Sequence, residues 1–98
     1  MNYSVEFIEE AKLDFKEAFQ WYESKIIGLG HKFINSLSIS ISIITANPYQ
    51  YQLQYGMIRK ALLKHFPYQV IYLIENDTMI VLGVIHSSRD PIIWENRI

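Results

Sequence analysis

The chain has 98 residues, of which 50% are hydrophobic and 19% are charged, with a formal net charge of −1 at pH 7. This length allows one domain with one hydrophobic core, and the composition excludes an intrinsically disordered chain. The chain contains no cysteine, which excludes disulfides, thiolate chemistry and cysteine-based metal sites.

The first part of the chain predicts a strand followed by a helix. Residues Tyr3 to Phe7 alternate and are rich in β-formers, which is typical of a strand. From Glu9 the apolar residues recur at three- and four-residue spacing, which predicts an amphipathic helix that ends near Lys25. Its apolar stripe comprises Ile8, Ala11, Phe15, Ala18, Phe19 and Tyr22, and we expect Glu10, Lys12, Asp14, Lys16 and Glu17 to lie on the solvated side.

The segment from Leu29 to Ala46 fits two kinds of element. Its centre alternates apolar residues with serine, as a strand does, but its apolar residues also form one helical stripe. That stripe comprises Phe33, Ile34, Leu37, Ile41 and Ile44. No turn signal interrupts the segment, and a strand of this length would be unusual, so we predict a helix. We expect it to follow a turn at Gly28–Gly30 and to end at Asn47–Pro48.

The chain after Pro48 predicts β-structure. We expect a loop or edge at Gln50–Gln54, strands at Met57–Phe66, Gln69–Ile74 and Thr78–Ser87, and turns at Pro67 and Glu75–Asp77. Strands this close in sequence pair as antiparallel hairpins. The predicted fold class is α+β, with the order β-α-α-β-β-β. Two N-terminal helices pack on one face of a small, twisted, mainly antiparallel sheet, as a single domain over residues 1–98.

Strict alternation assigns the strand residues to faces. In the Met57–Phe66 strand, Arg59 and His65 share one face, and Lys60 and Lys64 lie on the other. In the last strand, one face carries Ile80, Leu82, Val84 and His86, and the opposite face carries Met79, Val81, Gly83 and Ile85.

Charge is segregated along the chain. Residues 1–23 carry six acids and two bases, residues 24–74 carry five bases and no acid, and residues 75–98 carry four acids and two bases. Segregated charge creates a local field even when the total is small. We therefore expect the middle of the chain to present a basic face to phosphate or to an acidic protein.

Several basic residues could carry chemistry. Arg59 and Lys64 could offset the charge of a phosphodiester under attack, with Arg89 beside them and His86 as the proton carrier. Other roles stay open: His86 could merely end a strand, Arg89 could pair with Asp90, and Arg59 could hold the C-terminal tail. Neither a nucleophile motif, a glycine-rich phosphate loop nor a metal-ligand spacing is present, so we expect no metal and no cofactor.

The chain shows no apolar run near the roughly 18 residues of a spanning helix. Its first residues lack the basic and apolar regions of a signal peptide. We expect a soluble, cytoplasmic protein without membrane contact.

An ordered set of motifs runs along nearly the whole chain. It comprises Ala11, Asp14 and Ala18 before Trp21-Tyr22; Leu29-Gly30 with Phe33; Asn47-Pro48; Tyr55-Gly56-Met57-Ile58-Arg59; Phe66-Pro67-Tyr68 leading into Ile71-Tyr72; and His86-Ser87-Ser88-Arg89-Asp90-Pro91 with Trp94 and Arg97. No single motif is specific, but the set resembles the RelE/ParE superfamily of bacterial type II toxins. It is most similar to the ParE-like "plasmid stabilisation" branch.

The resemblance implies a partner. Such toxins inhibit growth until a cognate antitoxin folds its disordered C-terminal segment around them, which can yield a toxin–antitoxin hetero-oligomer. The acid-free middle of the chain favours an acidic antitoxin. The partner-binding residues that we expect are Arg59, Lys60, Lys64, Tyr68, Arg89 and Trp94.

The resemblance also implies a choice of target. RelE-like toxins cleave mRNA on the ribosome, whereas ParE-like toxins poison DNA gyrase without a hydrolytic site. An isoelectric point near 6.3 is poorly suited to binding a polyanion, which favours gyrase. The alternative is a ribosome-dependent, metal-independent endoribonuclease with Arg59, Lys64, His86 and Arg89 as catalytic residues, although Trp94 stands where some RelE-like toxins use a tyrosine. A third hypothesis is a decayed toxin, which has lost its toxicity and only binds its antitoxin.

Overall fold

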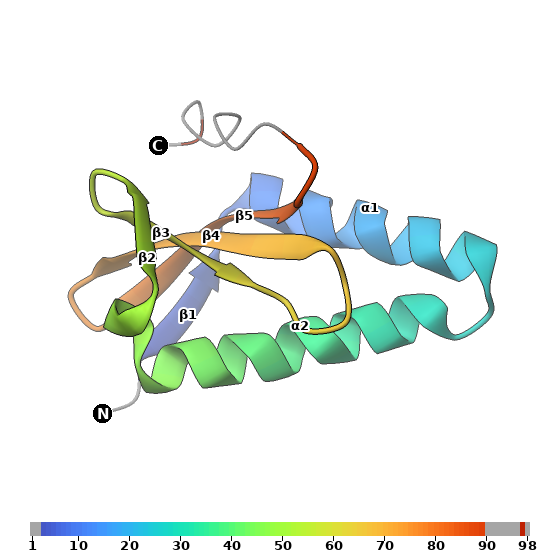
Figure 1. Ribbon diagram of the computed structural model, residues 1–98, viewed down its shortest axis with the longest axis horizontal. Coiled ribbons are helices and arrows are strands. Elements are labelled where there is room, and N and C mark those ends of the chain that lie inside the picture. The colour runs from blue at the N-terminus through green and yellow to red at the C-terminus, as the bar shows by residue number, and fades with distance from the viewer. Residues whose placement is uncertain (1–2, 90–96, 98) are drawn as a thin grey trace.

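The computed structural model describes residues 3–89 and Arg97. Two long helices form an antiparallel hairpin on one side of a five-stranded sheet (Figure 1). In chain order, the elements are β1 (Ser4–Phe7), α1 (Glu9–Lys25), α2 (Leu29–Ala46), the 3₁₀ turn η1 (Pro48–Gln50), β2 (Gln52–Tyr55), β3 (Ile58–Leu62), β4 (Tyr68–Glu75) and β5 (Thr78–His86). No helix among these residues is long and apolar enough to cross a bilayer.

The sheet has the strand order β1-β5-β4-β3-β2. Strand β1 runs parallel to β5, and the other three pairings are antiparallel. The predicted fold class, two helices on a mainly antiparallel sheet, is therefore confirmed. The segment predicted as a loop or edge supplies the edge strand β2, so the order is β-α-α-β-β-β-β.

The helix predicted over Leu29–Ala46 is confirmed as α2. Its buried residues Phe33, Leu37 and Ile44 recur at helical spacing and face the core, which leaves most of the serines outside. Buried Ala11 and Ala18 of α1 let that helix lie close to β5. Aromatic rings fill the wider space under α2, where Tyr22, Phe33, Phe66 and Tyr68 meet with centroids 5.0 to 6.1 Å apart.

A carboxylate fixes the turn between α1 and α2. Glu23 accepts hydrogen bonds from the N–H groups of Gly28 and Gly30, both at 2.9 Å. Gly28 has a φ of +91°, and a Cβ on Gly30 would lie 2.6 Å from the Phe19 carbonyl oxygen. Glycine is required at both positions, for the left-handed φ at one and for close helix contact at the other.

Two details of the predicted strands are wrong. Strand β3 ends at Leu62 rather than Phe66, and His65 adopts a left-handed φ of 72°. In β5, the register shifts so that Ile71 pairs with Gly83 but Tyr72 pairs with Val81. The extra residue, Leu82, is a β-bulge, and it breaks the strict alternation of faces that we predicted. Met79 and Val81 therefore face the helices together with Val84, while Ile80, Leu82 and Ile85 lie on the other face.

Candidate functional site

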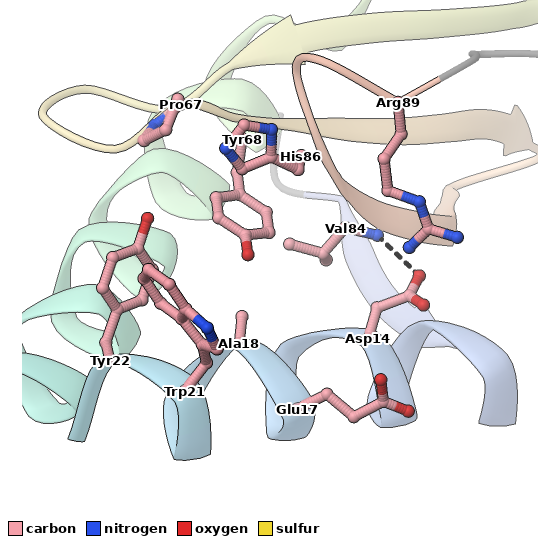
Figure 2. Close-up of a pocket in the computed structure, with 10 residues that line it drawn as sticks. All are labelled: Asp14, Glu17, Ala18, Trp21, Tyr22, Pro67, Tyr68, Val84, His86 and Arg89. Atoms are coloured by element: carbon pink, nitrogen blue, oxygen red, sulfur yellow. Dashed lines mark hydrogen bonds between the residues drawn. The ribbon is translucent and has the colours of Figure 1, made fainter. Parts of the chain in front are cut away.

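A hollow of about 480 Å³ opens between α1 and the adjoining ends of β4 and β5 (Figure 2). We call it the α1 hollow. It is lined by Asp14, Glu17, Ala18, Trp21, Tyr22, Pro67, Tyr68, Val84, His86 and Arg89. Three residues predicted from the sequence, Tyr68, His86 and Arg89, meet here.

The helix supplies one wall of the α1 hollow. Asp14, Glu17, Ala18 and Trp21 fall at three- and four-residue spacing, so they share one face of α1. Trp21 is 56% exposed despite its size, and Lys25 Nζ lies 5.0 Å from its ring centroid. An exposed tryptophan at the mouth of a hollow is typical of a protein-binding surface.

The sheet supplies the opposite wall. Tyr68 and His86 are directly paired across β4 and β5, and their ring centroids lie 5.2 Å apart. Burial raises the pKa of the Tyr68 phenol above its ordinary value, and the Arg89 charge offsets this only in part. Tyr68 is therefore a neutral hydrogen-bond donor at physiological pH.

The tight turn after β5 determines the tautomer of His86. The Ser88 N–H donates to His86 Nδ1 at 3.0 Å, and the Ser88 hydroxyl lies 2.7 Å from the same atom. A backbone N–H can only donate, so Nδ1 is the unprotonated nitrogen and the neutral ring carries its proton on Nε2. In this tautomer the Nε2–H group is the hydrogen-bond donor of the ring.

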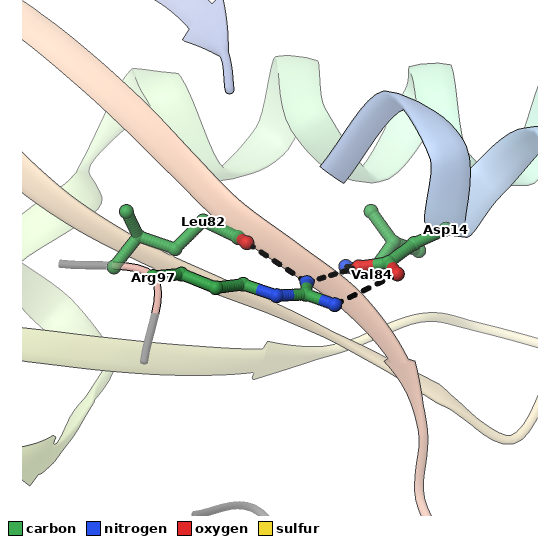
Figure 3. Close-up of polar contacts among 4 residues, drawn as sticks. All are labelled: Asp14, Leu82, Val84 and Arg97. Carbon is green, nitrogen blue, oxygen red and sulfur yellow. Dashed lines mark hydrogen bonds and ion pairs between the residues drawn. The ribbon is translucent and has the colours of Figure 1, made fainter. Parts of the chain in front are cut away.

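Beside the hollow, an ion pair closes the open edge of β5 (Figure 3). Strand β1 pairs with β5 only as far as Val81, so the groups beyond it lack a neighbouring strand on that side. Asp14 accepts the Val84 N–H at 3.0 Å, and Arg97 donates to the Leu82 carbonyl at 3.1 Å. Asp14 and Arg97 also contact each other through two hydrogen bonds of 2.6 and 3.2 Å.

The position of Asp14 differs from our prediction. We expected a solvated side chain, but it is 11% exposed and that of Arg97 is 14% exposed. The sequence did contain a signal for the burial of Asp14, because this residue lies three residues after buried Ala11 and four before buried Ala18. An acid within such a stripe indicates a buried partner.

Arg59 lies away from the α1 hollow. Its guanidinium donates to the carbonyls of Tyr49 and Tyr51 at 3.1 and 2.7 Å, and it lies over the Tyr49 ring. The Tyr72 hydroxyl donates to the Pro48 carbonyl at 2.6 Å nearby. Arg59 therefore holds the η1 turn against β3 and β4.

The other predicted residues are also dispersed. Lys60 pairs with Ile71, whose side chain lies on the sheet face opposite the helices. Lys64 is exposed in the β3–β4 loop, where its carbonyl accepts a 2.7 Å hydrogen bond from Ser36 of α2. Trp94 lies outside the described residues. The structure thus brings Tyr68, His86 and Arg89 together but separates them from Arg59, Lys60 and Lys64.

Residues 3–89 and 97 contain no cluster of three or more histidine, aspartate or glutamate side chains that could hold a metal ion. The described residues that line the α1 hollow offer hydrogen-bonding groups, charges of both signs and aromatic rings.

Residues 5–91 match the family model described as the ParE toxin of the type II toxin–antitoxin system parDE. The chain belongs to the ParE toxin family. No curated protein matches the sequence significantly. Membership makes the chain a toxin of a type II toxin–antitoxin system, as the ordered motifs predicted.

Solved structures of ParE and RelE proteins share the ParE-family fold of this chain. The chromosomal ParDE system of P. aeruginosa matches with a TM-score of 0.74 at 13% identity, over 86% of this chain and 95% of that one. A mutant of the E. coli toxin RelE in the free state matches with a TM-score of 0.67 at 19% identity, and the match covers 90% of this chain and 86% of that one. The intact E. coli RelBE toxin–antitoxin complex matches with a TM-score of 0.67 at 17% identity, and the match covers 89% of this chain and 99% of that one.

Proposed function

We propose that this toxin inhibits growth by binding DNA gyrase, as a protein-binding inhibitor and not as a nuclease. A cognate antitoxin neutralises it in the cytoplasm, within a system that stabilises a plasmid or chromosomal locus. The family match is to ParE toxins, and gyrase is the target that the resemblance to ParE-like toxins implies. Two structural neighbours, a ParDE toxin–antitoxin system and a RelBE toxin–antitoxin complex, support the antitoxin as partner.

The dispersal of the basic residues is the observation that carries the proposal. Metal-free cleavage of RNA needs cations and a proton carrier within reach of one phosphate. The Arg59 guanidinium is engaged by two backbone carbonyls, and Lys64 lies in a different hollow from His86 and Arg89.

The charge around His86 supports the same conclusion. The α1 hollow is lined by the carboxylates Asp14 and Glu17 as well as by Arg89. Arg97 offsets the charge of Asp14, but Glu17 would repel an RNA phosphate, and His86 Nδ1 is occupied by Ser88. The hollow suits a protein surface with polar and aromatic groups better than a phosphodiester.

The proposal is tested with purified toxin, gyrase, ATP and relaxed plasmid. We expect supercoiling to fall with toxin concentration and linear plasmid to accumulate, because a poisoned gyrase retains cleaved DNA. Normal supercoiling would contradict the proposal. Ribosome-dependent cleavage of mRNA in a parallel translation reaction would instead support the hypothesis of a RelE-like endoribonuclease. Growth without arrest after induction would indicate a toxin that has lost its toxicity.

A further inference from the structure

The two sides of the sheet differ in how their edges are protected. Native proteins block open strand edges with charged residues, proline, bulges or covering segments, because such edges pair readily with other chains. On one side, β1 exposes the charged residue Glu6, and Asp14 and Arg97 close the part of β5 that extends beyond β1. On the other side, β2 lies beyond β3 and ends the sheet (Figure 1).

The sequence of β2 and of the residues before it favours pairing with another strand. From Tyr49 to Tyr55, glutamine alternates with tyrosine or leucine, without charge, proline or glycine. Uncharged segments of this kind, with high β-propensity, are typical of strands that pair between chains. The strand carries one protective feature, a β-bulge between Leu53 and Tyr55. Leu53 is 49% exposed, so β2 presents an apolar side chain at an uncharged edge.

Contacts within the chain hold this edge in position. The Arg59 guanidinium donates to the carbonyls of Tyr49 and Tyr51 at 3.1 and 2.7 Å, which fixes the chain where it enters β2. Strand β2 then pairs with β3, with Leu53 opposite Arg59. Because β2 is already ordered, its pairing with a further strand costs little conformational entropy.

A second copy of the same strand complements β2. If two β2 strands pair antiparallel around a two-fold axis at Leu53, the two leucines lie opposite each other. Gln52 of each copy then lies opposite Gln54 of the other, and each pair of amides can donate and accept hydrogen bonds. No like charges meet, because the strand is uncharged, and the net charge of −1 on each chain adds little repulsion.

We propose that this toxin forms a symmetric dimer in which β2 pairs with β2 of a second copy, so that the two sheets join into one. The assembly closes at two copies, because the pairing occupies both β2 edges and the opposite edge of each sheet carries Glu6. The inference does not depend on the identity of the target.

The dimer leaves the α1 hollow accessible. The described residues that line the hollow belong to α1 and to residues 67–89, and none of them belongs to β2 or β3. Each dimer therefore presents two copies of the α1 hollow, which allows bivalent binding to a target with two matching surfaces.

Charge substitutions in β2 test the dimer and its register by analytical ultracentrifugation of the purified full-length toxin. We expect a dissociation constant on the order of 10 µM, because pairing through a four-residue strand makes a small interface. Gln52→Glu/Gln54→Glu places like charges opposite each other and should weaken the dimer roughly tenfold or more. Gln52→Glu/Gln54→Lys places opposite charges there, and its dissociation constant should stay within about threefold of the wild-type value.

The matched control is Ser38→Glu/Ser42→Glu, which adds the same charge at exposed sites of α2 and should dimerise as the wild type does. A wild-type toxin that stays monomeric up to about 1 mM would overturn the proposal. So would a dimer that both β2 double variants leave unchanged, because its interface would lie elsewhere. Assembly beyond two copies would overturn the two-fold closure. A monomer that loses antitoxin binding in Gln52→Glu/Gln54→Glu would assign the edge to a strand of another protein.

A cross-linking measurement covers the case in which a charged variant fails to fold. The chain contains no cysteine, so Leu53→Cys introduces a single thiol. The Cβ atoms of directly opposed residues lie about 4.5 to 5.5 Å apart, which is close enough for a disulfide after a small adjustment. Under mild oxidation, Leu53→Cys should yield a covalent dimer, whereas Ser38→Cys, at an exposed site of α2, should stay monomeric. Equal yields from the two variants would contradict the proposal.

Discussion

Several ionisable side chains hold backbone groups where regular hydrogen bonding stops. Asp14 and Arg97 complete the edge of β5, and Arg59 holds two carbonyls beside η1. His86 accepts the Ser88 N–H at the end of β5. Because these groups stabilise the fold, their substitution tests structure first, and a functional role must be separated from that effect.

Removal of the Asp14 carboxylate should destabilise the toxin strongly. Asp14→Ala leaves the Arg97 guanidinium without a carboxylate and the Val84 N–H without its acceptor in a largely buried setting. We expect a loss of about 3 kcal/mol in the free energy of unfolding, measured by urea denaturation. Glu17→Ala, three residues along α1 at an exposed position, should cost under roughly 0.5 kcal/mol. Equal effects of the two substitutions would contradict the edge-closing role of Asp14.

His86→Asn separates structure from proton transfer. The asparagine oxygen can still accept the Ser88 N–H, but an amide cannot move a proton at neutral pH. If the toxin acts by binding, growth arrest after induction should stay within about threefold of the wild type, scored as viable counts. A nuclease that uses His86 should lose roughly 100-fold or more of its activity, and that result would contradict a binding mechanism.

At the scale of elements, the α1–α2 hairpin depends on one turn. The Gly28 N–H lowers the pKa of Glu23, burial opposes this, and the Gly30 N–H and His31 act in the same direction as Gly28. A carboxyl group with a lowered pKa in the folded state stabilises the fold above its unfolded pKa. That contribution is lost as the pH falls through the folded pKa.

The stability of the toxin should therefore fall in acid, partly through Glu23. Urea midpoints measured from about pH 7 down to about pH 3 should decline less steeply for Glu23→Gln than for the wild type, because glutamine does not titrate. Glu17→Gln serves as the control and should leave the decline unchanged. If the Glu23→Gln curve ran parallel to that of the wild type, the hydrogen bonds from Gly28 and Gly30 would not favour the charged form of the Glu23 carboxyl group over its protonated form.

Close contact between the helices makes Gly30 irreplaceable. A Cβ there would meet the backbone oxygen of Phe19 at 2.6 Å, and backbone cannot move aside as a side chain can. Gly30→Ala should cost about 2 kcal/mol in thermal or urea unfolding, despite the roughly 1 kcal/mol advantage of alanine in helices. Ser42→Ala, at an exposed site on the same helix, should be neutral or stabilising. A more stable Gly30→Ala variant would refute the predicted clash.

Local patterns in the sequence predicted most elements, and tertiary contacts explain the differences. The length of the segment from Leu29 to Ala46 identified α2 correctly although serines alternate within it. The bulge at Leu82 has no local signal, because it arises where β5 must pair with β4 while α1 and Arg97 occupy its other edge. The contacts of Arg59 could not be predicted from the sequence either, because they depend on the position of η1 relative to β3 in the folded chain.

The candidate site was only partly predictable. Tyr68 and His86 are close because β4 and β5 are neighbours in sequence and pair as a hairpin. Lys64 and Arg89, by contrast, are separated because the β3–β4 loop turns toward α2 while the segment after β5 turns toward α1.

At the scale of the molecule, the toxin presents two separate surfaces. The α1 hollow carries acids, aromatic rings and Arg89, whereas a hollow between α2 and the β3–β4 loop is apolar and basic. The two surfaces therefore differ in the kind of partner that each can bind. We propose that the toxin stops growth by binding gyrase.

The most direct test measures plasmid topology and transcript 5′ ends in the same culture soon after the toxin is induced. Our account predicts plasmids that lose supercoils and break, with transcript ends as in the uninduced culture. Intact supercoiling together with new translation-dependent transcript ends would contradict it.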